Sequence, residues 1–336
     1  LPIYLLRLAT ALLAPIWPAV RDPDNLHLVG RLLAILFDLG TIFLTYRLAH
    51  QLGVRPQRPE HGTEGGKGAA GSGQPVAGTA PWIALLIAAM VSLAVLHIQL
   101  AHFYTADPLL AFFVILTLSL AFDVARGAGR WHRVGLGLGL GLALATKVSA
   151  APLILVPAVA HYYASTRAER PARRLLQTWP IVQRTVVTLL ISAVVFFVTQ
   201  PYALIDWSTF VSHTLRESQI AWGRLEVPYT LQYVGTWPYL YPAWQVAVWA
   251  LALPVGLAAW AGWLLLIVGW LRRGGWAAGL ILAWAGAYFA ITGLLYAKPL
   301  RYMLPLVPVL VGLAGFLPRH LGWCRSGERA QRRLGR

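Results

Sequence analysis

One acidic side chain stands between two long apolar runs, in the stretch from His102 to Pro108. This residue is Asp107, and a carboxylate at the edge of a hydrocarbon layer costs enough free energy to mark a functional site by default. It could act as a general base or as a ligand for a divalent metal. A structural role is the alternative, because an acid just before Pro108 suits the first turn of a helix and complements its dipole. His102 and Tyr104 could orient a substrate hydroxyl or a phosphate, or could anchor the chain at the membrane interface.

Four basic residues form a second group of candidates. Lys147 ends a glycine-rich apolar run, and Lys298 and Arg301 lie in the connection before the last apolar run. Arg31 lies one turn inside its own apolar run and belongs to the same group. Lysine and arginine bind phosphate through charge-assisted hydrogen bonds, so these residues are candidates for holding a lipid-linked phosphate. The alternative is that they reach toward lipid head groups.

Aromatic residues are dense between 201 and 244, and Tyr302 follows Arg301. Trp237, Tyr104 and Tyr302 are candidates for lining a substrate groove. Such residues also form the aromatic belts of membrane proteins, and a groove could hold either a lipid tail or a sugar face. The sequence leaves these interpretations open.

The remaining polar motifs favour structural roles. Asp38 lies in the middle of an apolar run and is predicted to make a polar contact inside a helix bundle, whereas Asp123 is predicted to be solvated. The glycines at 135, 137, 139 and 141 indicate close helix packing, since no Walker-type Gly-Lys-Ser/Thr follows them. No His/Cys cluster has zinc spacing, and the single cysteine, Cys324, excludes an intrachain disulfide.

The elements that would position these residues are membrane-spanning helices. The chain has 58% hydrophobic and 12% charged residues, with a mean hydropathy of +0.61. Its apolar runs have the length of membrane spans. We therefore expect an all-α polytopic membrane protein with about nine transmembrane helices, at 27–50, 81–101, 107–125, 133–147, 150–164, 184–200, 243–271, 276–296 and 300–318.

Charge sets the expected orientation. The net charge of +16 comes mainly from Lys and Arg in one set of connections and in the tail, which the positive-inside rule makes cytoplasmic. The charge is thus a topology signal, and no nucleic-acid partner is expected. A single span over 133–164 would reverse the next loop and place its arginines outside. We therefore predict two short spans in a hairpin, with Lys147, Ser149 and Asp107 on the outer side.

The segments between spans differ in composition. Residues 1–26 are predicted to form an outer segment with an apolar helix, broken by Pro15, Pro18 and Pro23 before the first span. Residues 53–80 are rich in Gly and indicate a disordered cytoplasmic linker. Residues 201–242 form the large outer loop, with a surface helix near 206–222. The transmembrane domain covers 1–320, and 321–336 is a basic cytoplasmic tail.

Several motifs, taken together in order and sidedness, resemble those of the GT-C glycosyltransferases, in the branch of protein O-mannosyltransferase-like and aminoarabinose-transferase-like enzymes. The similarity covers most of the chain. The motifs are Val29-Gly30-Arg31-Leu32-Leu33, His102-x-x-x-x-Asp107, Ala143-Leu-Ala-Thr-Lys147-x-Ser149 with Pro152, and Lys298-x-x-Arg301-Tyr302-x-Leu304-Pro305.

The resemblance implies an enzyme of the plasma or inner membrane with its active site on the outer face. It would transfer a sugar from a polyprenyl-phosphate donor to a protein, lipid or glycan acceptor, with inversion and with no certain cofactor. The family's main acidic base lies in a first outer loop, so the chain is expected to be truncated upstream of Leu1. Asp107 then matches the second acidic position, with His102 beside it. Lys147, Lys298, Arg301 and Arg31 would bind the donor phosphate.

Two other classes remain as alternatives. A transporter or flippase for an anionic lipid or solute predicts inverted repeats and polar residues near the membrane midplane. The chain shows no paired repeat, and its notable charges gather at one face, which favours surface chemistry. A catalytically incomplete remnant is the other alternative, because the first acidic loop is not in this sequence.

Overall fold

The computed structural model describes residues 1–53, 81–168 and 178–320, and every regular element in these ranges is helical. The predicted linker and basic tail lie outside the described residues, apart from Gly53 at the end of α2. The α-helices are α1 (Pro2–Leu13), α2 (Leu26–Gly53), α3 (Pro81–Ser92), α4 (Val95–Ala101), α5 (Ala106–Ala125), α6 (Arg130–Thr146), α7 (Leu155–Ala168), α8 (Thr178–Thr199), α9 (Tyr202–Ile205), α10 (Trp207–Ala221), α11 (Leu240–Gln245), α12 (Leu253–Arg273), α13 (Trp276–Ile281), α14 (Ala287–Thr292) and α15 (Val307–His320).

The described part of the chain has six helices long and apolar enough to cross a membrane. A seventh candidate is the pair α3 and α4, which bends by 55° at a short break. The nine predicted spans are therefore only partly supported. The segment Trp276–Thr292 is apolar but shorter than this length, and α6 is not among the candidates.

The predicted span 243–271 is wrong at its start. The helix of α11 continues as a π-helical turn, Val246–Ala250, and then breaks. Ala252 has φ +63°, a conformation that L residues rarely adopt, and Pro254 occupies the first turn of α12. The span therefore begins at Leu253. The hydropathy of the flanking residues gave no sign of this break.

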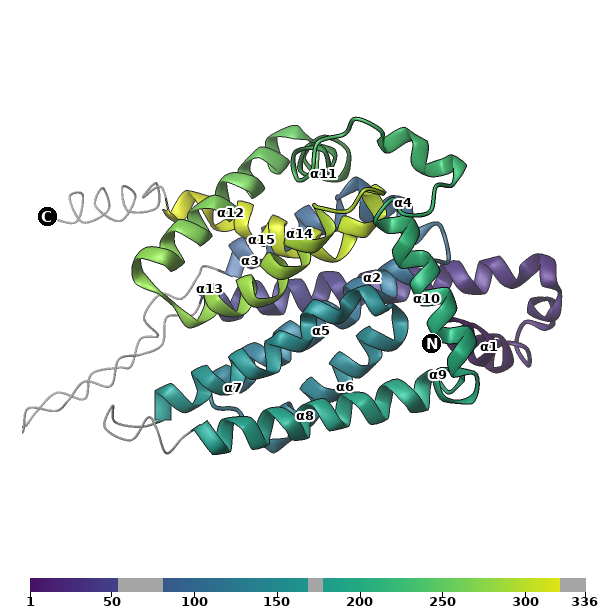
Figure 1. Cartoon of the computed structure of the whole chain (residues 1–336), viewed down its shortest axis with the longest axis horizontal. Coiled ribbons are helices and arrows are strands. Elements are labelled where there is room, and N and C mark those ends of the chain that lie inside the picture. The colour runs from purple at the N-terminus through teal and green to yellow at the C-terminus, as the bar shows by residue number, and fades with distance from the viewer. Residues whose placement is uncertain (54–80, 169–177, 321–336) are drawn as a thin grey trace, which may run out of the picture.

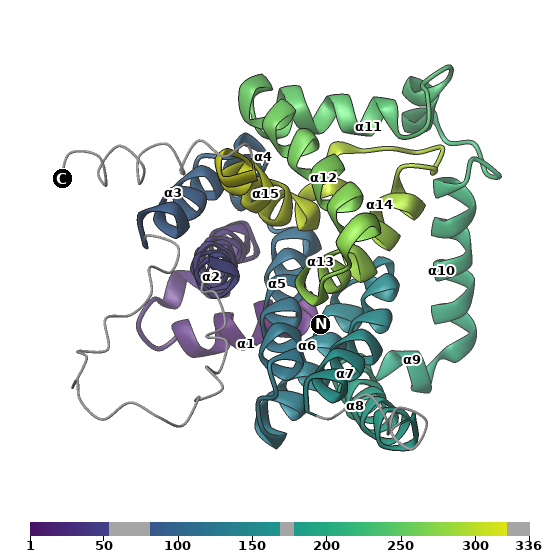
Figure 2. The same cartoon turned by 90° about the vertical axis from the view of Figure 1, so that its left-hand side faces the viewer.

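The helix α5 forms the centre of the bundle. Figure 2 shows it between α2 on one side and α6 and α7 on the other, with α12 and α15 above it. The most apolar window of α5 is 78% buried, against 11% for α8, so α8 presents most of its surface to the surroundings. Figure 1 shows α10 at one end of the bundle and the α12–α13 connection at the opposite end.

The glycine run allows close helix packing, as predicted. A Cβ at Gly137 would lie 2.8 Å from the carbonyl oxygen of Thr188 in α8, and one at Gly141 would lie 2.6 Å from that of Ser192. Gly139 faces the other way, toward Thr117 of α5. The small residues thus let the backbone of α6 pack directly against α8 and α5.

Two acidic residues inside the bundle have defined partners. The Asp38 carboxylate lies 2.5 Å from Nδ1 of His97, a buried residue just after the α3–α4 bend, so the predicted polar contact is confirmed. Asp123 was predicted to be solvated, and this is wrong. Its carboxylate accepts hydrogen bonds from Arg47 at 2.5 Å and Gln51 at 2.8 Å, both in α2.

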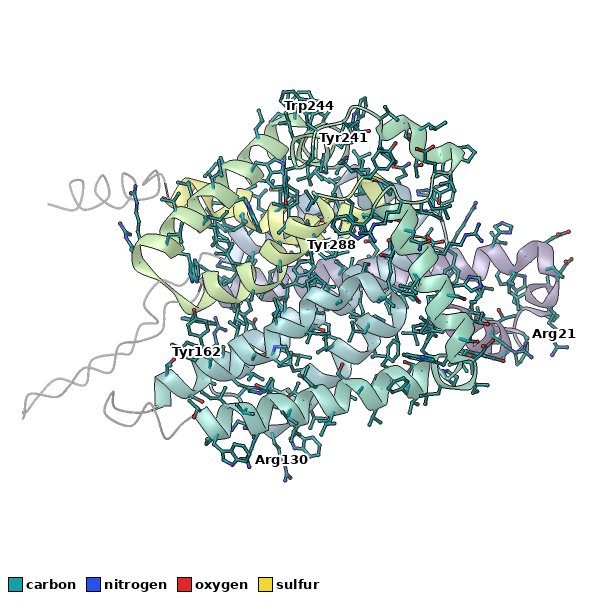
Figure 3. The ribbon with its side chains drawn as sticks, in the orientation of Figure 1. Arg21, Arg130, Tyr162, Tyr241, Trp244 and Tyr288 are labelled. Atoms are coloured by element: carbon teal, nitrogen blue, oxygen red, sulfur yellow. The ribbon has the colours of Figure 1, made fainter. Side chains whose placement is uncertain are left out.

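The first 26 residues form an apolar helix and a proline-rich break, as predicted from the composition of this segment. The helix α1 exposes apolar side chains such as Ile3 and Leu12, and short 3₁₀ turns at Pro18–Arg21 and Pro23–Asn25 precede α2. A small separate cluster of Ala14, Val20 and Val29 packs this segment against α2. Figure 3 shows Arg21 at the same end of the molecule, pointing outward.

Candidate functional site

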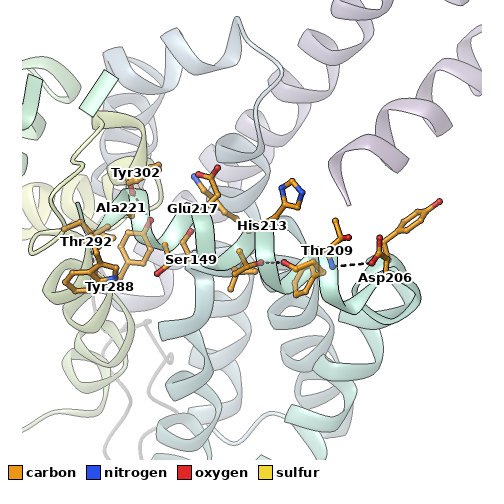
Figure 4. Close-up of a pocket in the computed structure, with 17 residues that line it drawn as sticks. Ser149, Asp206, Thr209, His213, Glu217, Ala221, Tyr288, Thr292 and Tyr302 are labelled. Carbon is orange, nitrogen blue, oxygen red and sulfur yellow. Dashed lines mark hydrogen bonds between the residues drawn. The ribbon is translucent and has the colours of Figure 1, made fainter. Parts of the chain in front are cut away.

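A cavity of about 800 Å³ lies beneath α10 at the end of the bundle. Its walls come from the α6–α7 connection, from α9 and α10, from α14 and from the segment around Tyr302. Figure 4 shows these walls, with Tyr288, Thr292 and Tyr302 at one end and Asp206 at the other. A cavity of this volume is large enough for a small-molecule or lipid head group.

Lys147 is the cation that lines this cavity. The helix α6 ends at Thr146, and Lys147 adopts an extended backbone conformation that turns the chain toward α7. The predicted break between two helices over 133–164 is therefore present, whereas the prediction that both cross the membrane as a hairpin is supported only for Val148–Thr166. The Nζ of Lys147 donates a hydrogen bond to the carboxylate of Asp107, in the first turn of α5, at 2.8 Å.

Asp107 lies in the first turn of α5 and is only 4% exposed. The N-cap residue of α5 is Thr105, so Asp107 complements the helix dipole from inside the first turn. The residue does not line the cavity, and its carboxylate faces Lys147. A buried carboxylate needs such a partner, because an unpaired buried charge is strongly unfavourable.

The ring of Tyr302 lies beside the Lys147 side chain, and Tyr288 supports the Tyr302 backbone. Nζ of Lys147 lies 4.5 Å from the ring centroid of Tyr302, within the range of a cation–π interaction. The Tyr288 hydroxyl donates a hydrogen bond to the backbone carbonyl of Tyr302 at 2.8 Å. Both tyrosines line the cavity, so Lys147 is held between a carboxylate and an aromatic wall.

The other predicted cations do not line the cavity. Lys298 is buried, and its ammonium group donates hydrogen bonds to the hydroxyl of Thr236 at 3.1 Å and to the carbonyl of Tyr296 at 3.2 Å. Burial lowers the pKa of Lys298. Arg301 is exposed, with its guanidinium 5.9 Å from the Tyr302 ring centroid, and Arg31 is exposed on α2.

The remaining predicted residues also lie away from the cavity. His102 is exposed, and its Nδ1 contacts the carbonyl of Ile98 at 2.7 Å, within the last turn of α4. The Tyr104 hydroxyl donates to the carbonyl of Pro2, its ring packs on Gly30, and burial raises its pKa to about 12. Trp237 is 71% exposed. Tyr104 therefore joins α1 to the α4–α5 connection.

The surface helix predicted near 206–222 is α10, and its contribution to the site was not predicted. Its polar residues Asp206, His213 and Glu217 all line the cavity and repeat at helical spacing. The Asp206 carboxylate caps α10 by accepting the backbone N–H of Thr209 at 3.3 Å. Hydrogen bonds from the Thr209 side chain and backbone lower the pKa of Asp206. This periodicity was readable, but nothing in the sequence indicated what the helix faces.

Contacts at the end of α10 fix its position. Gly223 has φ +71°, which ends the helix, and the Tyr296 ring packs where a Cβ would be. The backbone N–H of Ala297 donates to the carbonyl of Ala221 at 3.1 Å. The segment that carries Lys298 therefore holds α10 over the cavity.

Metal binding is a possible role that the sequence left open for Asp107. No group of three or more His, Cys, Asp or Glu side chains within these ranges could hold a metal ion. Asp107, the predicted candidate ligand, has the Lys147 ammonium group at 2.8 Å.

Comparison with solved structures identifies the fold. The chain is similar to ArnT from Cupriavidus metallidurans in the apo state, with a TM-score of 0.52 and 18% identity over 94% of this chain and 50% of ArnT. It is also similar to the archaeal oligosaccharyltransferase AglB from Archaeoglobus fulgidus, with a TM-score of 0.51 and 15% identity over 98% of this chain and 43% of AglB. No protein-family model and no curated protein matches the sequence.

The chain thus shares its helical fold with ArnT and AglB, and this similarity to GT-C glycosyltransferases agrees with the resemblance of the sequence motifs. The chain spans about half the length of the solved structures that it matches. At these identities the similarity defines the fold alone.

Proposed function

We propose that this protein is a membrane glycosyltransferase that uses a polyprenyl-phosphate-linked sugar as its donor. The observation that carries the proposal is Lys147, a cation that lines a cavity of about 800 Å³ while a buried carboxylate holds it in place. The fold supports the same conclusion. The AglB structure is described as a complex with a dolichol-phosphate and an inhibitory peptide, so a protein of this fold binds a lipid phosphate.

Lys147 would stabilise the leaving group. In an inverting transfer the acceptor oxygen attacks the anomeric carbon, and the bond to the phosphate oxygen breaks on the opposite side. Negative charge then builds on the lipid phosphate, where a fixed ammonium group lowers the energy of the transition state. Lys147 uses one N–H on Asp107, and the ammonium group has two more donors for a phosphate.

Asp107 would act through Lys147. Its carboxylate is buried and already accepts a hydrogen bond from that lysine, so it is poorly placed to meet an acceptor hydroxyl. We infer that it fixes the Lys147 side chain and keeps it from swinging into solvent. Its position in the first turn of α5 makes this support rigid.

We further propose that the cavity faces the outer side of the plasma or inner membrane. The arginine pair in the last turn of α12 lies at the opposite end of the bundle from α10. Such an arginine-rich connection is typical of the cytoplasmic side. With α6 and Trp276–Thr292 as short additional spans, the chain would have the nine spans that the sequence indicates.

The test compares Lys147→Met with Arg272→Met in the full-length protein. Arg272 is an exposed cation in the last turn of α12 and serves as the matched control. We expect Lys147→Met to reduce release of undecaprenyl phosphate from undecaprenyl-phosphate-linked mannose about 100-fold or more in native membranes. Its affinity for undecaprenyl phosphate should fall roughly 10-fold or more, since a charged hydrogen bond is lost. Unchanged binding and release in Lys147→Met would contradict the proposal.

A further inference from the structure

Two arginines lie side by side where α6 and α8 begin, at the end of the bundle away from α10 (Figure 1). The glycines of α6 that meet the carbonyls of α8 follow one register. Gly137 faces Thr188, and the next pair of residues lies one turn further along both helices. One turn earlier on each helix, the same register sets Arg133 beside Arg184.

Neither guanidinium group is paired within the described part of the chain. Arg133 is half-buried and Arg184 is exposed, and neither side chain forms a hydrogen bond or an ion pair with a described residue. Asp123, at the same end of α5, already accepts hydrogen bonds from Arg47 and Gln51. Two unpaired arginines side by side repel each other, so their arrangement favours an anion between them.

The surrounding backbone and a buried histidine add to this preference for an anion. Both α6 and α8 begin here with no acidic residue in the first turn, so the positive ends of two helix dipoles are uncompensated. His161 of α7 is buried, and its Nδ1 lies 3.2 Å from the hydroxyl oxygen of Thr185, the residue after Arg184. Its Nε2 is also buried and forms no hydrogen bond with a described residue. Unpaired polar nitrogens from three helices therefore lie at one level of the bundle.

This end of the bundle lies at the level expected for lipid head groups. Trp131 and Trp179, in the first turns of α6 and α8, are 71% and 66% exposed, and exposed tryptophans are typical of the membrane interface. Figure 3 shows Tyr162 and Arg130 on the side of the molecule away from Arg21. From here α8 continues as an exposed apolar surface, with only 11% of its most apolar window buried. A lipid whose phosphate lies at the arginines would thus have its acyl chains along α8.

We propose that Arg133 and Arg184 bind the phosphate of an anionic phospholipid at this end of the α6–α8 pair. The two free oxygens of the phosphodiester accept hydrogen bonds from the two guanidinium groups, whose planar geometry matches that of phosphate. A zwitterionic lipid carries the same phosphate, but its ammonium group would meet two arginines and two helix dipoles of like charge. The site does not rest on the proposed glycosyl transfer. Arg133 lies at the opposite end of α6 from Lys147, roughly 21 Å away along the helix axis.

The test measures binding of phosphatidylglycerol and of phosphatidylcholine with the same acyl chains to the full-length protein in detergent, by native mass spectrometry. We expect the wild type to bind phosphatidylglycerol about 10-fold more tightly than phosphatidylcholine. The double variant Arg133→Gln/Arg184→Gln should lose this preference through an about 10-fold lower affinity for phosphatidylglycerol, because charged hydrogen bonds are lost. The matched control is Arg272→Gln/Arg273→Gln, which removes an exposed arginine pair from the last turn of α12. Its affinity should stay within about twofold of the wild type.

The outcomes separate a lipid site from general attraction. A wild type without the preference, or equal losses in the two double variants, would overturn the inference, since positive charge at this end would then act without a specific site. Displacement of phosphatidylglycerol by an equal concentration of inorganic phosphate would also overturn it, because the ligand would then be a free phosphate. If the double variant does not fold, Arg184→Gln alone takes its place at an exposed position. An about threefold loss of affinity in that variant supports the inference, and wild-type affinity overturns it.

Discussion

The helix α5 carries one carboxylate at each end, and both are paired with a cation from a neighbouring helix. Asp107 pairs with Lys147 at 2.8 Å, and Asp123 pairs with Arg47 at 2.5 Å, roughly 24 Å further along the helix. Their side chains are 5% and 13% exposed. Burial and pairing are therefore alike at the two ends and do not by themselves indicate a functional site.

The two pairs differ in what surrounds the cation. Asp123 accepts from both Arg47 and Gln51, and Arg47 also donates to Ser119 at 2.8 Å. Arg47 and Gln51 both come from α2, so this pair ties α2 to α5. Lys147, in contrast, faces a cavity and an aromatic ring. A cation beside a cavity can bind a ligand with its remaining donors, whereas the contacts of Arg47 hold two helices together.

The largest expected effect comes from Asp107→Asn. The variant removes the charge that holds Lys147, and displacement of a catalytic group by about 1 Å can cost roughly 100-fold in rate. We expect release of undecaprenyl phosphate from its mannose-linked form to fall by about that factor. Thermal unfolding of the full-length protein checks that the fold persists. A variant with wild-type release would mean that Asp107 only complements the dipole of its helix.

Asp123→Asn is the control at the other end of the same helix. It breaks a partly buried pair, so we expect a loss of about 1–2 kcal/mol in the free energy of unfolding. Release of undecaprenyl phosphate should stay within about twofold of the wild type. If both variants lost activity equally, the contrast between the two ends of α5 would be wrong.

A smaller effect is expected from Gly141→Ala in α6. A Cβ here meets the carbonyl oxygen of Ser192 at 2.6 Å, so α6 must move away from α8. The displacement reaches Lys147, six residues later, and we expect roughly a 10-fold loss of release with about 1–3 kcal/mol of destabilisation. Gly312→Ala in α15 is the control, because a Cβ there meets no atom within 4 Å. Equal behaviour of the two variants would show that close packing of α6 does not position the lysine.

The sequence predicted the parts of this architecture that depend on composition and local spacing. Apolar length located most helices, and the side on which the following arginines must lie located the break between α6 and α7. Asp107 and Lys147 were both chosen, but their contact joins residues 40 positions apart, and only the packing of α5 against α6 creates it. The break between α11 and α12 was not predicted, because hydropathy carries no information about backbone conformation. The contribution of α10 to the cavity was not predicted, because its polar residues do not indicate in the sequence which side of the helix faces a cavity.

The smallest effect is expected for Lys298, whose ammonium group is buried like a structural partner. Lys298→Met should leave the affinity for undecaprenyl phosphate within about twofold, because its donors already bond to Thr236 and Tyr296. Burial lowers the pKa of Lys298, so between that lowered pKa and 10.5 the unfolded chain binds more protons than the folded protein. The stability contributed by this site therefore rises with pH in that window, and the variant should lack the rise. Thermal unfolding of both proteins across the window measures it. A fall in affinity as large as that of Lys147→Met would instead make Lys298 a ligand of the lipid phosphate, and the cationic end of the cavity would then include two lysines.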